Sequence, residues 1–366
     1  MNVSTLLVLV FCIAVLPAVY LVSYQRWERA RTEGNRYFSL MSLQRRGLRK
    51  LIAFHGFLLR PYVSLLARVL PKPDRLPALV YEEVAVPGAV CDRQTMDFAC
   101  NYHPVAEDLF VVTQMKCGTT WMQQMAYQVL SHGEGSFSDH SHVHLYNTSP
   151  WIETHSGVPF AAAPRIGVAG KRLIKSHLNA ALCPFSARAK YIYVARHPVS
   201  CFASITDFVE LLLGPMAPER AALLDWYCSD EMFYTAWPDH VADWWDVALE
   251  RDNVLFLHYE QMKADSRATI ERVAGFLGES LSEQAAAEVL RKSSFEFMSA
   301  HADQFEMTPP NLFSETSSLG FFQSGSSRRH HDVDPAERDR ILAFCRQRLA
   351  GRAYPCEQHY PELRVP

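Results

Sequence analysis

The segment LFVVTQMKCGTTW, residues 109–121, decides the fold of this 366-residue chain. Its first four residues, Leu109–Val112, are apolar and predict a buried strand, and the residues from Thr120 to Leu130 predict a helix. Gly118 lies in the turn between them, where a residue without a side chain lets backbone N–H groups point at a ligand. A strand, a tight turn and a helix in this order are typical of an α/β domain.

The turn carries the groups that a phosphate-binding site needs. Lys116 supplies a full positive charge, the amino terminus of the helix supplies a partial one, and Thr119 and Thr120 supply hydroxyls. The segment is not a Walker A loop, because that motif ends in Gly-Lys-Ser/Thr and here the lysine precedes the glycine. The pattern therefore predicts a phosphate cradle and disfavours the ordinary nucleotide triphosphatases.

Three further apolar runs predict strands of the same kind. They are Leu173-Ile174, Tyr191–Ala195 and Val254–Leu257, with helices expected at Pro198–Leu212 and Ser266–Leu277. Strands that are apolar on both faces and alternate with helices indicate a parallel sheet covered on both sides, an α/β doubly wound domain. Ligands of such domains gather beyond the carboxyl ends of the strands. The polar residues that follow each strand are therefore the candidate site.

Composition and charge narrow the class of protein. With 49% hydrophobic and 20% charged residues, the chain describes one large or two modest globular domains and excludes disorder, collagen and coiled coil. Nine cysteines without a C-x-x-C pair fit neither a disulfide scaffold nor a zinc ribbon, which favours a reducing compartment. Between Arg26 and Arg75, twelve Lys and Arg face three acidic residues, although the whole chain carries a net charge of −3. One end of the chain therefore suits an anionic surface.

The amino end predicts a membrane anchor. Residues 1–25 contain no charged side chain, and Leu6–Val22 is almost wholly apolar and long enough to cross a hydrocarbon core. A cleaved signal peptide is the alternative, but its basic n-region and small-residue cleavage site are not seen. Arginines follow the span and none precedes it, so the positive-inside rule predicts a single-pass protein whose domain faces the cytoplasm. The Asn147 sequon would then stay unglycosylated.

The next segment predicts a basic amphipathic helix. Apolar residues recur at helical spacing from Ser42 to Leu70 with arginines and a lysine between them, and Pro61 is expected to kink or split the helix. It either lies in the headgroup layer of a membrane or packs on the domain as an ordinary helix. The predicted organisation is an anchor at 1–25, this helix and a proline-rich linker at 26–80, and a catalytic domain at 81–366.

Several of these segments resemble one enzyme family. The run KCGTTW, residues 116–121, is similar to the 5′-phosphosulfate-binding loop of sulfotransferases that use 3′-phosphoadenosine 5′-phosphosulfate (PAPS), especially the cytosolic type that acts on small alcohols and phenols. The usual Tyr-Pro before the lysine is replaced by Gln114-Met115. Lys175–Leu178 resembles the K-T-H-L segment of the family, whose histidine is the catalytic base. Residues 257–263, LHYEQMK, and 151–153, WIE, are similar to further family segments, so that the resemblance covers about Phe98 to Leu349.

The resemblance implies a P-loop-like fold and a division of roles among residues. His177 would take the proton of an acceptor hydroxyl, and Lys116 and Lys175 would stabilise the charge of the leaving phosphate and of the sulfuryl oxygens. Arg196 and Ser204 correspond to the pair that binds the 3′-phosphate. The implied co-substrate-binding set is Lys116, Gly118, Thr119, Thr120, Trp121, Arg196, Ser204, Tyr259, Gly325 and Arg328. No metal and no nucleic acid is expected; the partners are a small, lipophilic hydroxyl acceptor, a membrane and, by the family pattern, a second copy in a homodimer.

The carboxyl-terminal part departs from the family pattern. Where the family has R-K-G-x-x-G-x-W-K, this chain has Gln323-Ser324-Gly325, so that Arg328 or Arg329 substitutes for the missing cations or the 3′-phosphate is held less tightly. The dimer motif is only loosely matched at residues 328–337. A lumenal carbohydrate sulfotransferase, a non-catalytic nucleotide-binding relative and a nucleoside kinase remain alternatives. A metal site at His140, His142 and His144 is disfavoured, because no carboxylate or cysteine spacing completes it.

Overall fold

A four-stranded parallel sheet forms the centre of the protein in the computed structural model, which describes residues 4–5, 11–137, 143–313 and 333–364. The strand order is β4-β3-β5-β6. The bounds are Asp108–Val112 for β3, Arg172–Ser176 for β4, Lys190–Ala195 for β5 and Val254–His258 for β6. The parallel α/β sheet and its four strands are therefore confirmed, because each predicted run lies within one observed strand.

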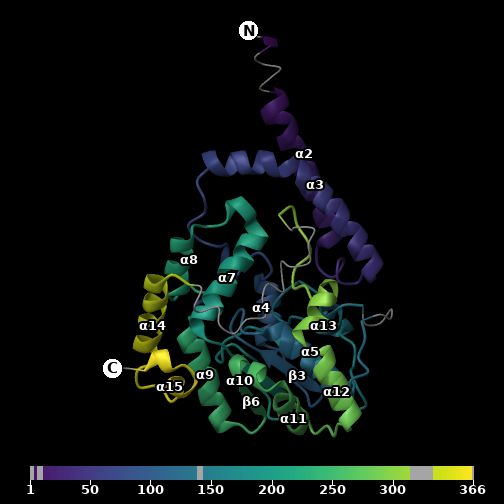
Figure 1. Cartoon of the computed structure of the whole chain (residues 1–366), viewed down its shortest axis with the longest axis vertical. Helices are drawn as coiled ribbons and strands as arrows, with labels where there is room; N and C mark the ends of the chain where they lie inside the picture. Colours follow the sequence, from purple (N-terminus) through teal and green to yellow (C-terminus); the bar gives the residue numbers. More distant parts are fainter. Residues whose placement is uncertain (1–3, 6–10, 138–142, 314–332, 365–366) are drawn as a thin grey trace.

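Helices cover both faces of this sheet (Figure 1). Alternate residues of β3 show the arrangement, since Phe110 and Val112 belong to one hydrophobic core while Leu109 and Val111 belong to the other. One face packs against α5 (Thr119–Leu130), α11 (Ser266–Leu277) and α12 (Glu283–Lys292). The other packs against α7 (Pro198–Leu213), α8 (Arg220–Tyr227), α9 (Trp237–Glu250) and α14 (Pro335–Leu349).

The strand order fixes where a ligand can bind. The chain passes from β3 to β4 on one side and then crosses back over β3 to form β5 on the other side. This reversal opens a crevice beyond the carboxyl ends of β3 and β5, because their following segments leave in opposite directions. The turn at residues 113–118 and the segment that begins at Arg196 flank this crevice.

Smaller elements surround the sheet. An antiparallel hairpin of β1 and β2 precedes it, and short helices lie between the strands and after the last one. Their bounds are Ala78–Tyr81 (β1), Val84–Pro87 (β2), Arg93–Cys100 (α4), Leu145–Thr148 (α6), Tyr259–Ala264 (α10), Phe295–Ala300 (α13) and Cys356–His359 (α15).

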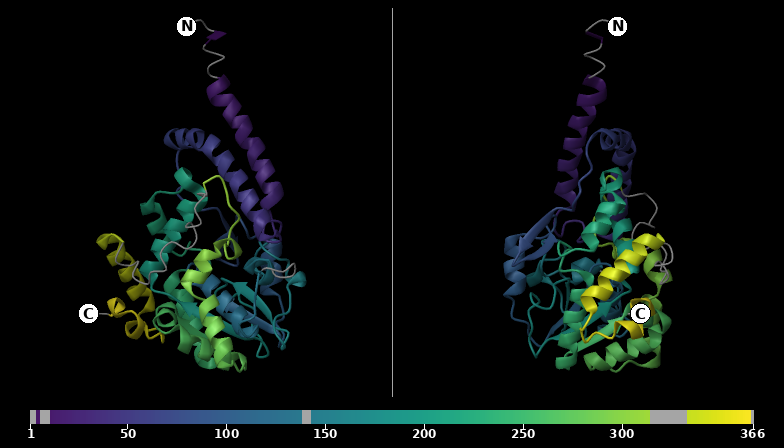
Figure 2. Two further views of the ribbon diagram at one scale, coloured as in Figure 1. Left: turned by 45° about the vertical axis from the view of Figure 1, so that its right-hand side comes forward. Right: turned by 90° about the vertical axis from the view of Figure 1, so that its left-hand side faces the viewer.

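Two long helices stand at the amino end. A π-helical turn at Phe11–Val15 leads into α2 (Leu16–Thr32), which projects away from the sheet, and α3 (Ser42–Val69) follows it. Figure 2 shows that α3 changes direction along its length, as Pro61 in its second half predicts, because proline removes an N–H and clashes with the preceding turn. Tyr24, Leu59 and Val63 pack together with Leu312 and join both helices to the body.

The membrane anchor stays a prediction. Residues 6–10 of the expected span lie outside the described part of the chain, and α2 runs without interruption past residue 25, where the anchor was expected to end. Within the described ranges, one helical segment is long and apolar enough to cross a membrane, namely Pro198–Met216, and half of it is buried inside the protein. That segment is α7 and its continuation, which pack against the sheet and α14.

Candidate active site

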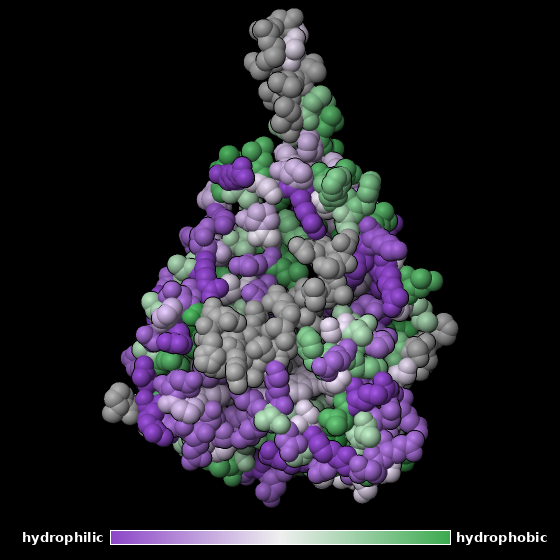
Figure 3. Space-filling model, in the orientation of Figure 1, coloured by the Kyte–Doolittle hydropathy of each residue, from purple (hydrophilic) through white to green (hydrophobic). Residues whose placement is uncertain are grey.

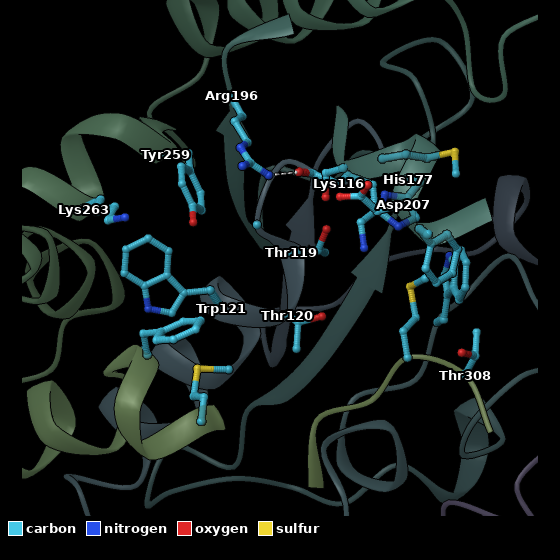
Figure 4. A pocket seen from close by; sticks show the side chains of 18 of the residues that line it. Lys116, Thr119, Thr120, Trp121, His177, Arg196, Asp207, Tyr259, Lys263 and Thr308 are labelled. Carbon is cyan, nitrogen blue, oxygen red and sulfur yellow. Dashed lines mark hydrogen bonds between the residues drawn. The ribbon is translucent and has the colours of Figure 1, made fainter. Parts of the chain in front are cut away.

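A cavity of about 820 Å³ lies beyond the carboxyl ends of the strands. Nine of the residues predicted for the site line it, and Figure 4 shows the labelled ones converging from the turn after β3, the ends of β4 and β5, α5 and α10. These nine are Lys116, Gly118, Thr119, Thr120, Trp121, His177, Arg196, Ser204 and Tyr259. Residues far apart in the sequence thus meet at one place, as the strand order requires.

The turn after β3 has the conformation that its sequence demands. Lys116 has φ +61° and Gly118 has φ +97°, both in the left-handed region that favours glycine. A Cβ atom on Gly118 would lie 2.7 Å from Cδ2 of Tyr259, so a side chain there would clash with the ring. Glycine is therefore required at position 118 for two reasons, the left-handed backbone conformation and the close approach of the Tyr259 ring.

The amino terminus of α5 presents its first residues to the cavity. Thr119 and Thr120 are buried, and the hydroxyl of Thr119 lies 2.6 Å from that of Thr113 while the hydroxyl of Thr120 lies 3.2 Å from Tyr146 Oη. The N–H groups of the first turn have no partners inside the helix, and the helix dipole adds positive potential. This end of the cavity consequently suits a phosphate group.

The guanidinium of Arg196 places a positive charge at the same end of the cavity. Its Nη1 donates to the carbonyl of Lys116 at 2.9 Å, and its guanidinium carbon lies 4.5 Å from the centre of the Tyr259 ring (Figure 4). Its Nε is buried and has no acceptor within hydrogen-bond distance among the described residues. A buried donor of a charged group is costly to leave unpaired, so the site fits an anion placed beside Arg196. Ser204 lines the same part of the cavity from α7.

Trp121 and Tyr259 form an aromatic wall. Their rings meet edge to face with centroids 5.3 Å apart. The indole N–H of Trp121 donates to the carbonyl of Ser293 at 2.8 Å, so it is not available to a ligand while this bond persists. Trp121 can therefore contact a flat ligand by stacking with its ring, but not through its indole N–H.

His177 lies between the phosphate-binding end and the rest of the cavity. It is 3% exposed, and its Nδ1 donates to the carbonyl of Thr113 at 2.7 Å. This bond fixes the tautomer in which Nε2 carries a lone pair. Burial lowers the pKa of His177 well below its ordinary value, and the nearby Lys175 lowers that pKa further. The imidazole is thus neutral near pH 7.

Lys175 is brought close to this point but does not line the cavity. It is fully buried under Met307, whose sulfur lies 3.1 Å from its Nζ, and that nitrogen lies 3.5 Å from the centre of a Trp151 ring. Burial lowers the pKa of the Lys175 ammonium well below its ordinary value. The sequence predicted Lys175 directly after the strand at Leu173-Ile174, whereas the structure places it within β4, one residue before the strand ends. A pattern of strands also does not reveal which side chain covers it.

Glu153 positions the histidine from behind. Its Oε1 accepts hydrogen bonds from the backbone N–H of His177 and from the indole N–H of Trp151, both at 2.6 Å. The carboxylate is fully buried, and burial raises its pKa. Glu153 therefore holds the His177 segment and Trp151 together through these two hydrogen bonds.

Several predicted features lie outside the described residues. They include Gly325 and Arg328, with the rest of the altered carboxyl-terminal motif, and also His140 and His142. The remaining histidine of that run, His144, is buried, and its Nδ1 accepts from the backbone N–H of Tyr146 at 3.0 Å. In the described ranges there is no group of three or more His, Cys, Asp or Glu that suits a metal ion.

The loosely matched dimer motif is also covered only in part. Val333 is buried in the core of its own chain, and Glu337 accepts from Arg220 at 2.8 Å. These two side chains therefore have partners within one chain, and the homodimer stays a prediction.

Sequence reasoning missed part of the cavity wall. The cavity is also lined by Asp207 on α7, Lys263 on α10 and the segment Ser293–Met298. One signal was available for that segment, because Ser294 precedes an apolar run and caps α13 by accepting from the N–H of Phe297. The position of Asp207 one turn after Ser204 was a second signal, since both lie on one side of α7.

The opposite end of the cavity is apolar. It is formed by loops and helix ends that are far apart in the sequence. Gln114, in the phosphate turn, holds one of these loops by donating to the carbonyls of Phe233 and Thr235, each at 2.8 Å. The apolar lining includes Leu76, Pro77, Val90, Met115, Phe208, Leu212, Leu213, Phe233 and Met307.

A phosphate-binding turn at the switch point of a parallel sheet, next to a neutral histidine in an apolar cavity, defines a group-transfer enzyme that uses a phosphorylated donor. The family described as "Sulfotransferase domain" matches residues 106–352. Sulfotransferase 2A1 of Macaca fascicularis is 31% identical over 241 residues, which cover 63% of this chain and 81% of that protein. The 3-beta-hydroxysteroid sulfotransferase of Cavia porcellus is 30% identical over 262 residues, which cover 69% and 88%.

Solved structures share the fold. Mouse sulfotransferase SULT7A1 complexed with PAP superposes with a TM-score of 0.59 at 20% identity and covers 78% of this chain and 98% of that one. Retinol dehydratase in complex with androsterone and inactive cofactor PAP gives 0.58 at 18% identity and covers 76% and 92%. The chain belongs to the family of PAPS-dependent sulfotransferases, enzymes whose co-substrate is PAPS. The resemblance drawn from the sequence is thereby confirmed.

Proposed function

We propose that this enzyme transfers the sulfuryl group of PAPS to the hydroxyl of a small, lipophilic alcohol of steroid type, with His177 as the general base. One observation carries the proposal. A neutral imidazole lies where a phosphate-binding turn and an apolar wall meet, and its Nδ1 is fixed by the carbonyl of Thr113. The names of the relatives, among them a 3-beta-hydroxysteroid sulfotransferase, support the acceptor class.

The residues of the polar end fit PAPS. The N–H groups at the start of α5, with Thr119, Thr120 and Lys116, would hold the 5′-phosphosulfate. Arg196, whose Nε is unpaired, and Ser204 would hold the 3′-phosphate, and Trp121 and Tyr259 would flank the adenine. When bound, PAPS supplies an activated sulfuryl group; every other requirement of the reaction falls to the protein.

His177 meets the requirements of the base. Because its Nδ1–H is engaged with Thr113, the lone pair of Nε2 is available to an acceptor hydroxyl. Its lowered pKa keeps it unprotonated at neutral pH, so that it is ready to accept a proton. Glu153 and His240 hold its backbone, since the His177 N–H donates to Glu153 and His240 Nε2 donates to the His177 carbonyl at 3.0 Å.

Lys116 and Lys175 supply the positive charge that the transfer needs. Lys116 lines the cavity in the turn that precedes α5, and Lys175 lies behind Met307. An anion in the cavity favours the charged form of Lys175, which burial otherwise disfavours. Preorganised cations of this kind act most strongly where water is excluded.

The amino end of the chain is proposed to anchor the enzyme in a membrane, with the catalytic domain in the cytoplasm. The apolar residues 6–22 and the arginines that follow them support this arrangement. The folded domain offers little access to the sequon, because Thr148 is buried and its hydroxyl donates to the carbonyl of His144. A tether of this kind would keep the apolar cavity near membrane-dissolved alcohols.

Substitution of the base tests the proposal. We expect His177→Ala to lower kcat by about 10²–10⁴-fold on a hydroxysteroid, the usual contribution of a general base. Affinity for adenosine 3′,5′-bisphosphate, measured by calorimetry, should change less than about threefold, because His177 lies beyond the phosphate cradle. The control is His132→Ala, at a surface histidine that pairs with Glu279. A His177→Ala enzyme with unaltered kcat would refute the assignment of the base, and an inactive parent chain across alcohols would refute the acceptor class.

A further inference from the structure

The exposed side of α3 is apolar. Large hydrophobic residues recur along it at intervals of three, four or more positions, with Phe57 75% exposed and Val69 70% exposed. The opposite side is buried against the body through Ile52, Gly56 and Leu59. The exposed apolar set, here called the α3 stripe, is Leu43, Leu51, Phe54, Phe57, Leu58, Leu65 and Val69.

A helix that packs on a protein in water normally presents polar residues on its outer side. The sequence offered two interpretations of this helix, packing on the domain or lying in the headgroup layer of a membrane. Both remain compatible with the structure, because α3 packs on the domain with one face and exposes an apolar second face. A contiguous exposed hydrophobic surface of this kind marks an interaction site.

The charges beside the stripe indicate its partner. Arg46, Lys50 and Arg68 are exposed on α3, and no aspartate or glutamate occurs between Ser42 and Val69. Basic residues that flank an apolar helical face are the pattern of helices that lie in the headgroup layer of an anionic membrane. An acidic protein groove would satisfy the cations, but it would leave the extended apolar stripe without a matching surface.

The arrangement of α2 and α3 fits the same partner. Figure 1 shows α2 rising away from the body, while the second half of α3 runs across the top of the body in a different direction. In Figure 3 hydrophobic side chains gather on the shoulder from which the amino-terminal helix projects. A helix that enters a bilayer beside one that lies along its surface would have this geometry.

The buried side of α3 is tied to the wall of the active-site cavity. Arg45 pairs with Asp303 at 3.3 Å, and Arg49 pairs with Glu306. The residue after Glu306 is Met307, which lines the cavity and covers Lys175. The position of α3 is therefore coupled to the apolar wall through two ion pairs that are largely shielded from water.

A second cavity lies beneath the second half of α3. It has about 310 Å³ and is lined by residues of α2, by Val63, Leu66 and Leu70, and by Leu212. Leu212 lines the active-site cavity as well, so this side chain borders both spaces. Val63 is buried on the side of α3 that faces the body, so α3 itself covers this second cavity.

We propose that the part of the α3 stripe from Phe57 to Val69 docks onto an anionic lipid leaflet, with Arg68 in the headgroup layer. This contact is separate from the proposed anchor, because it concerns a helix along the surface and does not require the span.

The test uses the full chain reconstituted into phosphatidylcholine vesicles with and without phosphatidylserine. A bimane label on Phe57→Cys, in a Cys12→Ser background, reports contact with lipids that carry a quencher on their acyl chains. The matched control is Val168→Cys, at a fully exposed residue in the turn before β4, at the amino-terminal ends of the strands. Both positions are on the surface, so neither substitution should disturb folding.

We expect quenching at Phe57→Cys to exceed that at Val168→Cys severalfold when phosphatidylserine is present. Arg68→Glu should shift the equilibrium between docked and undocked protein by about fivefold or more, since each basic residue near an anionic surface contributes about that factor. The control Arg188→Glu, at an exposed arginine before β5, should leave it unchanged.

Equal quenching at the two labelled positions, or quenching that ignores phosphatidylserine, would overturn the proposal. Protection of the Phe57→Cys label from aqueous iodide without quenching by lipid would mean that a protein covers the stripe, which would overturn it as well. Retention of the chain by vesicles after an alkaline wash reports the anchor separately, so that failure of the anchor and failure of the docking are distinguished.

Discussion

The two ends of the active-site cavity are built in different ways. The phosphate-binding end comes from one strand–turn–helix unit, with Lys116, Gly118 and Thr119 within four residues, and Arg196 at the end of the neighbouring strand. The apolar end combines the linker after α3, the carboxyl end of α7 and loops near residues 233 and 307. The first end depends on local backbone geometry, whereas the second depends on tertiary packing. Substitutions at the two ends should therefore separate co-substrate binding from acceptor choice.

The largest effect on co-substrate affinity is expected for Gly118→Ala, because this substitution alters the backbone of the phosphate turn. The Cβ atom of the alanine would lie 2.7 Å from the Tyr259 ring, and the alanine would have to adopt φ +97°. We expect affinity for adenosine 3′,5′-bisphosphate to fall by about 100-fold or more, because strain of a few kcal/mol acts directly on the phosphate turn. Calorimetric titration measures it.

Gly170→Ala is the matched control for Gly118→Ala. Gly170 also has a left-handed φ, +58°, but a Cβ atom there would meet no atom within 4 Å. The control therefore carries the backbone cost without the clash and lies away from the cavity. If Gly118→Ala bound the bisphosphate as well as Gly170→Ala does, the turn would not be the phosphate site.

The next effect concerns Arg196, at the end of β5. Arg196→Ala should weaken adenosine 3′,5′-bisphosphate by about 10–100-fold, the contribution of hydrogen bonds to a charged group, and weaken adenosine 5′-monophosphate by less than about threefold. Arg196→Ala also removes the hydrogen bond from Arg196 to the Lys116 carbonyl. Loss of that bond would weaken the binding of the two nucleotides equally, so the comparison between them isolates the contact with the 3′-phosphate. Equal loss for the two nucleotides would contradict a role at the 3′-phosphate.

Most residues that the sequence predicted for the phosphate-binding end line the cavity, whereas much of the apolar end was not predicted. A strand is read from four apolar residues, and the residues that follow it lie at the carboxyl edge of the sheet, which is why Lys116, His177 and Arg196 were found together. The fold followed from the same alternation of strands and helices. These inferences need only local patterns and one rule of topology.

The remaining features depend on contacts between distant segments. Nothing near Lys175 in the sequence indicates that Met307 covers it, and nothing near Leu212 indicates that it borders two cavities. The two meanings of the basic helix were also undecided, because a helical period does not say which face is buried. The structure resolves this point through Ile52 and Leu59 inside and Phe57 outside.

Leu212 allows a test of the acceptor end alone. Leu212→Trp should raise KM for a hydroxysteroid by about tenfold, within the range by which a hydrophobic pocket discriminates, and should leave KM for a small phenol and affinity for the bisphosphate within about twofold. Leu249→Trp, at an exposed leucine on α9, is the control. A uniform loss with both acceptors would show that Leu212 does not belong to the acceptor wall.

The smallest effect on activity is expected for two buried histidines, which also make the stability of the protein depend on pH under acidic conditions. His240 and His258 are buried, and burial lowers the pKa of His240 to about 4 and that of His258 to about 3. Above pH 6.5 each is neutral in the folded and unfolded states, so neither makes stability depend on pH. Below that value the unfolded chain takes up protons that the folded chain refuses, and the free energy of unfolding falls by about 1.4 kcal/mol per pH unit for each histidine.

Comparison of variants isolates these histidines from buried carboxylates such as Glu153, whose raised pKa acts in the opposite direction. Between pH 6.5 and 5, His240→Gln and His258→Gln should each flatten the pH dependence of the unfolding free energy by the same amount, as measured by denaturant titration. Only His240→Gln should also lower kcat, by a few fold, because His240 Nε2 donates to the carbonyl of His177 while His258 Nε2 contacts Tyr354 Oη. An equal loss of kcat in both variants would mean that acid sensitivity reaches the base through general loosening of the sheet, and the role of His240 as a positioning residue would have to be abandoned.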